Sequence, residues 1–380
     1  MTAHFKSDLG RDVNRLQLWK VVSVVLLACG LASAQTITSF SAPGAGTGAG
    51  QGTGGFGINP QGTVVGSYLD DGNVFHGYEC VSGCGSADTF TTYNAPGAGT
   101  AANQGTITFS INQSGLVLGY YIDANNVAHG FVTTPPFDTF VSLSDPDAGL
   151  GAGQGTFAGN INQRGEVAGY YIDANNVAHG FVTAPPYRSF TSYDPAGSVF
   201  TLTSIASALN PEGMATGTYF DASGVLHAYV RSANGAITEY NVKGAGTASG
   251  QGTSPSSINN QGETTGNYID SNGANHGYAR RRLGGVSTFD PPGSGTGSGQ
   301  GTIPEGIDLL GDITGQYIDS NGVNHGFVRD PFGNITTFDA TGAGTGSGQG
   351  TIPVTPNMFG VITGQYIDNN NVHYGFLRTP

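Results

Sequence analysis

Acidic and histidine side chains recur together along the chain, always six residues apart. One pair is Asp319 and His325, which flank a sequence typical of a tight hairpin turn. Across such a hairpin the carboxylate could hold the Nδ1–H group of the imidazole, which is half of a nucleophile triad. The pairs are Asp70 and His76, Asp123 and His129, Asp173 and His179, Asp221 and His227, Asp270 and His276, and Asp319 and His325.

These pairs are better explained as structural than as catalytic. A single active site needs one asymmetric arrangement, whereas the pair occurs in six copies and no repeat-specific Ser or Cys accompanies it. We therefore expect hydrogen bonds from Asp or His to the backbone that hold each hairpin together, and we predict no catalytic residue and no cofactor. Calcium remains an alternative because the turns are rich in oxygen, although Asx turns explain the same residues without a metal.

The pairs belong to a longer repeat with the pattern Gly-x-Tyr-x-Asp. Successive copies are 53, 50, 48, 49, 49 and 49 residues apart, a period of about 49. In the seventh copy Tyr374 takes the place of His. A period in this range indicates a solenoid or a propeller. The pattern residues are Gly66, Tyr68, Asp70; Gly119, Tyr121, Asp123; Gly169, Tyr171, Asp173; Gly217, Tyr219, Asp221; Gly266, Tyr268, Asp270; Gly315, Tyr317, Asp319; and Gly364, Tyr366, Asp368.

Turn signals divide each copy into four short extended runs. In the fifth copy, strand A is expected to end at Ile258, strand B to cover 268–270, strand C to carry His276 and Tyr278, and strand D to span 286–289. Four strands in about 49 residues match the size of a propeller blade. The 64 Gly residues and the 10% charged residues also fit a turn-rich, all-β protein better than a helical bundle.

The two ends of the repeat region complement each other. The chain stops after strand C of the seventh copy, and residues 37–40 resemble the missing strand D. We therefore predict a seven-bladed β-propeller over residues 35–380, closed by an N-terminal strand that completes the last blade. A glycine-rich calcium β-roll is disfavoured because stretches such as 342–351 lack the Asp that such a roll needs in every turn.

The units, for instance INQRGEVAGYYIDANNVAHGFV from residue 161, resemble the HAF repeats of secreted bacterial proteins, which are named for a His-Ala-Phe core. Here the triplet is His-Gly-Phe or His-Gly-Tyr in most units and His227-Ala228-Tyr229 in one. The resemblance covers nearly all of residues 36–380. It implies an extracellular, propeller-like repeat protein and brings no catalytic residue with it.

Residues 1–34 are interpreted as a signal peptide. Basic residues precede the apolar run 21–27, and Ala32-Ser33-Ala34 fits a cleavage site before Gln35. The alternative is a lipoprotein signal ending at Cys29, which would then carry a lipid anchor. The apolar run is too short for a membrane-spanning helix, and no other segment could cross a membrane. We expect a secreted, periplasmic or extracellular protein.

The remaining chain, residues 35–380, is strongly acidic. It holds 9 basic and 24 acidic residues, a net charge of −15, which argues against binding nucleic acid or an anionic membrane. Its two cysteines, Cys80 and Cys84, are predicted to form a local disulfide, because no second Cys or His pair lies nearby to complete a metal site. It contains no Trp, which weakens a sugar-binding interpretation that depends on aromatic platforms.

Other repeated residues are assigned to packing. The Gly-rich connectors, five of which contain Gly-Gln-Gly-Thr, are expected to link strand D to the next strand A, with Gln bonding loop amides. Each pattern Tyr is expected to face a Gly of the next blade. Symmetry breaks at residues 196–208, at Arg280-Arg281-Arg282, at Cys80 and Cys84, and at Tyr374, and these exceptions are the better places to look for a specific ligand.

Topology places the B–C hairpins and the D–A connectors on one face, where we expect any ligand to bind. The preferred function is a non-catalytic module that binds a protein or a glycan, or has a structural role, outside the cytoplasm. The alternative is an extracellular polysaccharide lyase or hydrolase, which would need a cluster such as two carboxylates about 5–10 Å apart from different blades.

Overall fold

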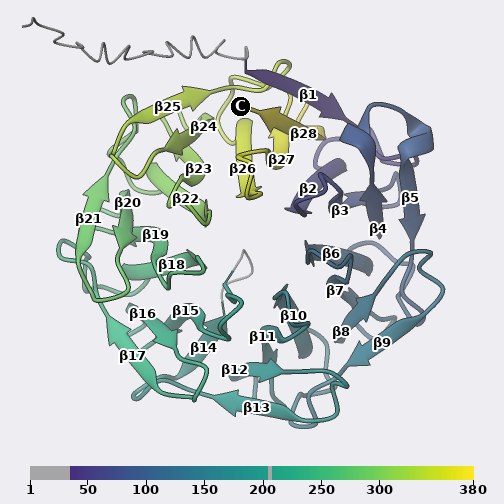
Figure 1. Ribbon diagram of the computed structural model, residues 1–380, viewed down its shortest axis with the longest axis horizontal. Coiled ribbons are helices and arrows are strands. Elements are labelled where there is room, and N and C mark those ends of the chain that lie inside the picture. The colour runs from purple at the N-terminus through teal and green to yellow at the C-terminus, as the bar shows by residue number, and fades with distance from the viewer. Residues whose placement is uncertain (1–34, 204–207) are drawn as a thin grey trace, which may run out of the picture. The chain divides into compact units, whose positions relative to one another are not determined.

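The computed structural model describes residues 35–203 and 208–380. The predicted signal peptide (1–34) and residues 204–207 of the apolar run lie outside the described residues. The described part is all-β, with two short 3₁₀ turns, η1 (Ser82–Cys84) and η2 (Ala87–Thr89). Repeated antiparallel units surround a central axis (Figure 1). We number each unit by the copy of the Gly-x-Tyr-x-Asp pattern that it contains.

Within each unit, strands A to D follow one another from the axis outward (Figure 1). The A strands are β2 (Gly52–Ile58), β6 (Gly105–Ile111), β10 (Gly155–Ile161), β14 (Phe200–Thr203), β18 (Gly252–Ile258), β22 (Gly301–Ile307) and β26 (Gly350–Pro356). The B strands are β3 (Val64–Leu69), β7 (Val117–Ile122), β11 (Val167–Ile172), β15 (Ala215–Phe220), β19 (Thr264–Ile269), β23 (Ile313–Ile318) and β27 (Ile362–Ile367).

The C strands are β4 (Phe75–Cys80), β8 (Ala128–Thr133), β12 (Ala178–Thr183), β16 (Leu226–Arg231), β20 (Asn275–Arg280), β24 (Asn324–Arg329) and β28 (His373–Thr379). The outer D strands are β5 (Phe90–Tyr93), β9 (Phe140–Leu143), β13 (Phe190–Tyr193), β17 (Ile237–Tyr240), β21 (Val286–Phe289) and β25 (Ile335–Phe338). The strand positions predicted for the fifth copy are confirmed to within a few residues.

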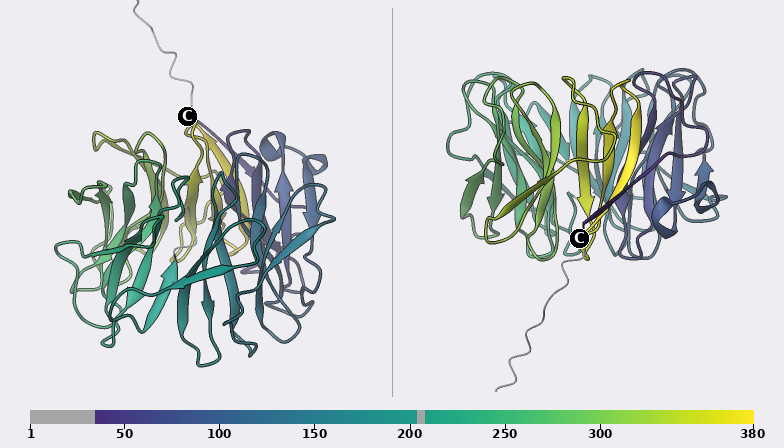
Figure 2. Two further views of the ribbon diagram at one scale, coloured as in Figure 1. Left: turned by 60° about the horizontal axis from the view of Figure 1, so that its bottom comes forward. Right: turned by 90° about the horizontal axis from the view of Figure 1, so that it is seen from above.

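The N-terminal strand β1 (Thr36–Phe40) occupies the D position beside β28. The two strands are antiparallel, and their register runs from Thr36 opposite Thr379 to Phe40 opposite Gly375. The pairing predicted between the two ends of the repeat region is therefore present. Seen from the side, the units stand next to one another with loops at both ends (Figure 2).

Neighbouring units are joined where strand A begins, in every unit except unit 4 among the described residues. Gly301 of β22 pairs in parallel with Asn275 of β20, and Gly52 of β2 pairs in the same way with His373 of β28. Gly301 has φ +101°, and a Cβ atom there would meet the carbonyl oxygen of Asn275. Only glycine fits both the positive φ and this close approach, which explains the Gly of the Gln-Gly-Thr sequence.

The core depends on the aromatic residue that ends the triplet of each unit, which is His-Gly-aromatic in five units, His-Ala-Tyr in unit 4 and Tyr-Gly-Phe in unit 7. These seven side chains are almost fully buried: Tyr78, Phe131, Phe181, Tyr229, Tyr278, Phe327 and Phe376. In unit 7 the ring of Phe376 lies against Gly364 of strand B, where a Cβ atom would approach it to 2.8 Å. The glycine of the Gly-x-Tyr pattern therefore leaves space for the triplet ring of its own unit.

In five units the triplet glycine accommodates a second ring, which comes from strand D. A Cβ atom on Gly326 would lie 2.7 Å from the ring of Phe338. Phe40 of β1 lies in the same way over Gly375, and it also packs at 6.3 Å from Tyr78 of unit 1. Phe40 therefore occupies the same position over the triplet glycine in unit 7 that Phe338 occupies in unit 6.

This packing predicts equal losses of stability from two aromatic truncations that lie far apart in sequence. We expect Phe40→Ala and Phe338→Ala each to lower the free energy of unfolding by about 3–5 kcal/mol, because both rings are buried. Chemical denaturation measures the change. Thr38→Ala, on an exposed position of β1, is the control and is expected to change stability by less than about 0.5 kcal/mol. A Phe40→Ala variant as stable as this control would contradict the docking of β1.

Candidate functional site

The repeated Asp and His residues form closed hydrogen-bond systems within their hairpins. Oδ1 of Asp319 accepts the backbone N–H groups of Asn321 at 2.8 Å and of Val323 at 2.9 Å. Burial alone would raise the pKa of the Asp319 carboxyl, but these N–H bonds outweigh it and hold the pKa below its usual value. The expected structural role of the pairs is therefore present in the hairpin geometry.

The histidine lies between two carboxylates and against a tyrosine ring. In unit 6, Nε2 of His325 is 3.8 Å from Asp319, Nδ1 is 3.1 Å from Asp339 beyond strand D, and the Tyr317 ring stacks on the imidazole at 4.9 Å. The hairpin carboxylate thus faces Nε2, and the expectation that it holds Nδ1–H is wrong. The reason is that Nδ1 points outward to the residue after strand D.

The same arrangement recurs with small changes in the other units. In unit 1, Asn94 bonds Nδ1 of His76 at 2.9 Å and Asp70 bonds Nε2 at 3.1 Å. In unit 7, Tyr366 stacks on Tyr374 at 5.2 Å, so Tyr374 preserves the stack without the imidazole. The pattern residues are therefore brought together within units and not into one shared site.

The prediction that each pattern Tyr faces a glycine of the next blade is wrong. The ring of Tyr317 lies against Gly293, a glycine of the connector that leads into its own unit. The connector folds back over strand B before strand A begins, because the N–H group of Gly295 donates to the carbonyl of Ile318 at 2.8 Å.

The connector glutamine does bond loop amides, as expected. Oε1 of Gln300 accepts the N–H group of Gly297 at 2.9 Å, and its Nε2 donates to the carbonyl of Ser320 in the hairpin of the following unit at 3.1 Å. The N–H group of Gly299 donates to the carbonyl of Gly273, in the B–C hairpin of the preceding unit, at 2.9 Å. Connectors and B–C hairpins therefore share one face, as predicted.

Two of the predicted exceptions prove to be structural. Cys80 and Cys84 form the expected disulfide. Arg280 does not belong to a free basic cluster: it is buried, and its guanidinium lies 4.4 Å from the centre of the Tyr240 ring of the preceding unit. Arg231, Arg329 and Arg378 stack in the same way on Tyr193, Phe289 and Phe338.

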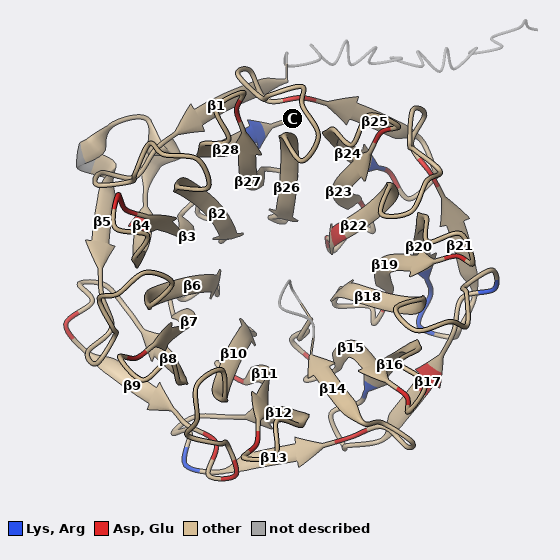
Figure 3. Ribbon diagram, turned by 180° about the vertical axis from the view of Figure 1, so that it is seen from behind, with Lys and Arg blue, Asp and Glu red and all other residues tan. Residues whose placement is uncertain are grey.

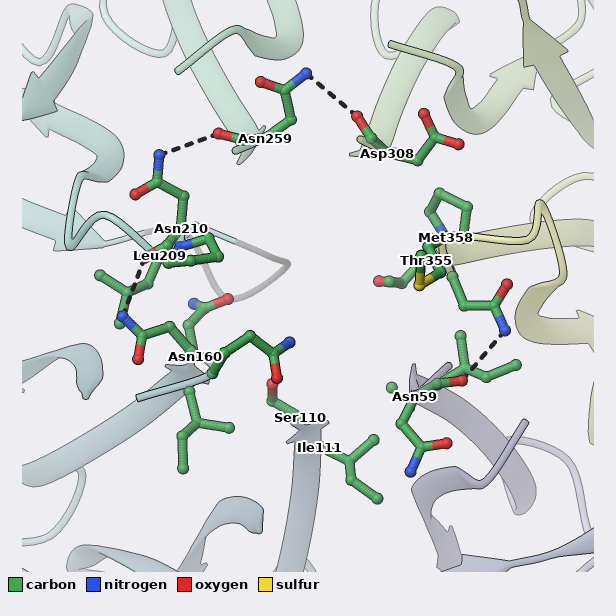
Figure 4. Close-up of a pocket in the computed structure, with 18 of the residues that line it drawn as sticks. Asn59, Ser110, Ile111, Asn160, Leu209, Asn210, Asn259, Asp308, Thr355 and Met358 are labelled. Carbon is green, nitrogen blue, oxygen red and sulfur yellow. Dashed lines mark hydrogen bonds between the residues drawn. The ribbon is translucent and has the colours of Figure 1, made fainter. Parts of the chain in front are cut away.

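A cavity of about 210 Å³ lies on the axis, at the ends of the A strands (Figure 4). This axial cavity is at the opposite end of the A strands from the face where we expected a ligand. Its wall is held by an amide chain that runs from unit to unit. Nδ2 of Asn162 donates to the carbonyl of Asn210, Asn210 to that of Asn259, and Asn259 to that of Asp308, at 3.0, 3.0 and 3.2 Å.

Sequence reasoning missed this amide chain, although a signal for it exists. An Asn-x-x-Gly sequence follows strand A in most units, as in Asn259 to Gly262. The same Asn also fixes the A–B turn, since Oδ1 of Asn259 accepts the N–H group of Glu263 at 2.9 Å. One side chain therefore stabilises its own turn and joins it to the next unit.

Unit 6 departs from this pattern, because Asp308 has no amide to donate. Oδ1 of Asp308 accepts the N–H groups of Leu310 and Asp312, and burial raises the pKa of its carboxyl. Asp308 is the single acid among the described residues that line the axial cavity. The cavity therefore offers neutral amides, aliphatic side chains and one carboxyl.

A second acid of unit 6 lies nearby on the inner strand. Figure 3 colours one stretch of β22 red, and Glu305 is the only acid of that strand. Glu305 occupies a bulge, because the register shifts between Pro304 and Gly306. Burial raises the pKa of its carboxyl to about 7. Neither its burial nor its pKa could be foreseen from the repeat.

A second cavity, of about 360 Å³, lies between units 7, 1 and 2. We call it the hairpin-face cavity, because Leu69, Phe75 and His373 beside the B–C hairpins line it, together with the connector residue Gly50. It lies on the face where a ligand was expected. The rest of its wall is Gly52, Gly54, Phe56, Ser67, Ile107, Phe109, Tyr120 and Gln365.

The raised pKa of Glu305 predicts a specific dependence of stability on pH. A carboxyl with a raised folded-state pKa stabilises the fold less as it ionises, so the contribution of Glu305 falls between pH 4.5 and about 7 and is constant above that. We expect Glu305→Gln to abolish this part of the pH dependence, as measured by denaturation at a series of pH values. Glu212→Gln on an exposed turn is the control. An unchanged pH profile in Glu305→Gln would contradict the raised pKa.

Comparison with known proteins identifies the fold and no family. No protein-family model and no curated protein matches the chain. The structure is similar to the BP39L lectin from Burkholderia pseudomallei, with a TM-score of 0.52 and 12% identity over 84% of this chain and 93% of that one. TolB from Acinetobacter baumannii matches with a TM-score of 0.49 and 10% identity over 72% of this chain, which spans 62% of TolB. At 12% identity the likeness to the BP39L lectin concerns fold alone, and the fold is a β-propeller.

Proposed function

We propose that residues 35–380 form a seven-bladed propeller whose ring is closed by the N-terminal strand. Three contacts between the two ends of the repeat region support this. β1 pairs with β28, Gly52 pairs with His373, and Nδ2 of Asn357 donates to the carbonyl of Asn59 at 3.2 Å. The last of these has the same partners and nearly the same length as the amide bonds that link units 2 to 6.

We further propose that the protein is a non-catalytic module that binds a glycan outside the cytoplasm. The observation that carries this proposal is the lining of the two cavities: it combines neutral amide, hydroxyl and imidazole groups with aromatic and aliphatic side chains, and Asp308 is its single acid among the described residues. Such surfaces orient a neutral polar ligand through hydrogen bonds and apolar contact. The resemblance to secreted HAF-repeat proteins and the signal-like residues 1–34 agree with export.

The alternative of a polysaccharide hydrolase gains no support from this geometry. Such an enzyme uses a pair of carboxyl groups across the scissile bond, and neither cavity has two among its described lining residues. The repeated Asp and His side chains are in turn engaged in hairpin bonds in several units. The acids Asp308 and Glu305 of unit 6 would be the first candidates if turnover were found.

A binding screen combined with an assay for turnover tests the proposal. The exported full chain is applied to an array of neutral and acidic glycans, and the same glycans are incubated with it and analysed for new reducing ends or unsaturated products. We expect retained binding to neutral glycans and no product. Product formation would replace the binding module with an enzyme, and binding to proteins but to no glycan would overturn the choice of ligand.

The hairpins also predict how the protein responds to removal of calcium. Oδ1 of each pattern Asp already accepts backbone N–H groups, as in Asp270, where Asn272 and Ala274 donate at 2.8 and 2.9 Å. Within residues 35–203 and 208–380, no group of three or more His, Cys, Asp or Glu is placed to hold a metal ion. We therefore expect the same melting temperature with and without chelator. A fall that added Ca²⁺ reverses would instead place the metal in the hairpins.

A further inference from the structure

The hairpin-face cavity exists because units 7, 1 and 2 differ from the other units at positions between the blades. The third residue of strand A is Gly54 in unit 1, where the other units carry Ile107, Phe157, Leu202, Ser254, Ile303 and Ile352. A Cβ atom on Gly54 would lie 2.7 Å from the ring of Phe56 and 2.9 Å from Oε1 of Gln365. The missing side chain therefore lets the Phe56 ring turn across strand A toward unit 7.

One side of this cavity is a series of aromatic rings. Phe56 and Phe109 have ring centres 5.6 Å apart, and Phe109 stacks on Tyr120 at 5.5 Å. Phe75 closes the wall at the start of strand C, where units 2 and 3 carry Ala128 and Ala178. All four rings are only partly buried. Partly exposed rings in a concave site form a platform for a flat apolar face of a ligand.

The other side of the cavity carries neutral hydrogen-bonding groups. Nδ1 of His373 lies 3.2 Å from Oε1 of Gln365, and because that oxygen only accepts, Nδ1 carries the proton and Nε2 is an acceptor. Burial lowers the pKa of His373, which keeps the imidazole neutral at pH 7. The side-chain NH₂ group of Gln365 is a donor. Oγ of Ser67 accepts the N–H group of Thr108 at 2.8 Å, so the hydroxyl proton of Ser67 can still be donated to a ligand.

No Asp, Glu, Lys or Arg is among the described residues that line this cavity. A charged ligand would therefore lose its hydration without gaining an ionic partner. The volume of about 360 Å³ lies at the lower end of the range for small-molecule sites. The ligand that fits is neutral, the size of one ring, apolar on one face and rich in hydroxyl groups at its edge.

We propose that the hairpin-face cavity is a subsite for one neutral pyranose residue, whose C–H face lies on the aromatic wall and whose hydroxyl groups bond Gln365, His373 and Ser67. This assignment rests on the proposed glycan-binding function and names its site. It places recognition around unit 1, between this unit and its neighbours 7 and 2, and not in the axial cavity.

Matched substitutions at equivalent positions of the repeat test the subsite. Phe75→Leu removes the flat ring but keeps an apolar residue, and unit 4 carries Leu226 at the same place. Gln365→Leu removes the amide. Its control is Gln316→Leu at the equivalent position of unit 6. The buried Oε1 of Gln316 has no hydrogen-bond partner. The second control is Leu226→Ala in another gap between units.

The probes are the neutral glycans that bind on the array and the methyl glycosides of glucose, galactose and mannose, with binding measured by calorimetry on the full chain. We expect Phe75→Leu and Gln365→Leu each to weaken binding at least tenfold, and both controls to bind within twofold of the parent. Melting temperatures and the circular dichroism spectrum report whether each variant folds, and Phe75→Tyr, which keeps a ring, is expected to retain binding.

The outcomes separate this inference from the function on which it rests. Glycan binding that survives Phe75→Leu and Gln365→Leu would overturn the subsite and leave the glycan-binding function standing. Equal loss of binding in the variants and their controls would also overturn the subsite, since it would show a general effect on packing. Binding of uncharged aromatic compounds in place of glycosides would reject a pyranose as the occupant. Absence of glycan binding by the parent chain would reject the function itself.

Discussion

Contact between aromatic rings and glycines is the constraint on which the rest of this structure depends. In unit 7 the triplet aromatic Phe376 lies over the strand B glycine Gly364, and the triplet glycine Gly375 lies under the ring of Phe40. Most other units repeat at least one of these two contacts. A side chain at either glycine would occupy the volume of a ring, and interiors packed to this density tolerate no such overlap. The high glycine content thus allows four strands to stack closely in most units.

This constraint explains what could be predicted from the sequence. The period, the four strands of a unit and the pairing of β1 with β28 follow from local patterns that recur, so each prediction is supported by several copies. Contacts between units were predicted poorly. Tyr317 faces Gly293 of its own connector, and Arg280 is buried on Tyr240, because both contacts depend on how a connector or a neighbouring unit folds back.

The cavities were harder still to foresee, because they are formed by residues that differ between units. The amide chain could have been found from the Asn-x-x-Gly sequence, but its direction from Asn210 to Asn259 to Asp308 depends on how the units are rotated about the axis. In the hairpin-face cavity, Gly54 and His373 are 319 positions apart in the sequence. No periodic signal connects two residues that each depart from the repeat.

Repetition also indicates where function can reside. The side chains of Asp319, His325 and Gln300 satisfy backbone and side-chain groups of the scaffold, so a ligand that used them would have to break bonds that hold hairpins and connectors. Side chains between the blades are less constrained, because they need only fill space. Gly54, Ser67 and Phe75 fill this space differently from the equivalent residues of other units. A repeat protein can therefore acquire one binding site by changing these residues in a single unit, while every hairpin and connector keeps its internal bonds.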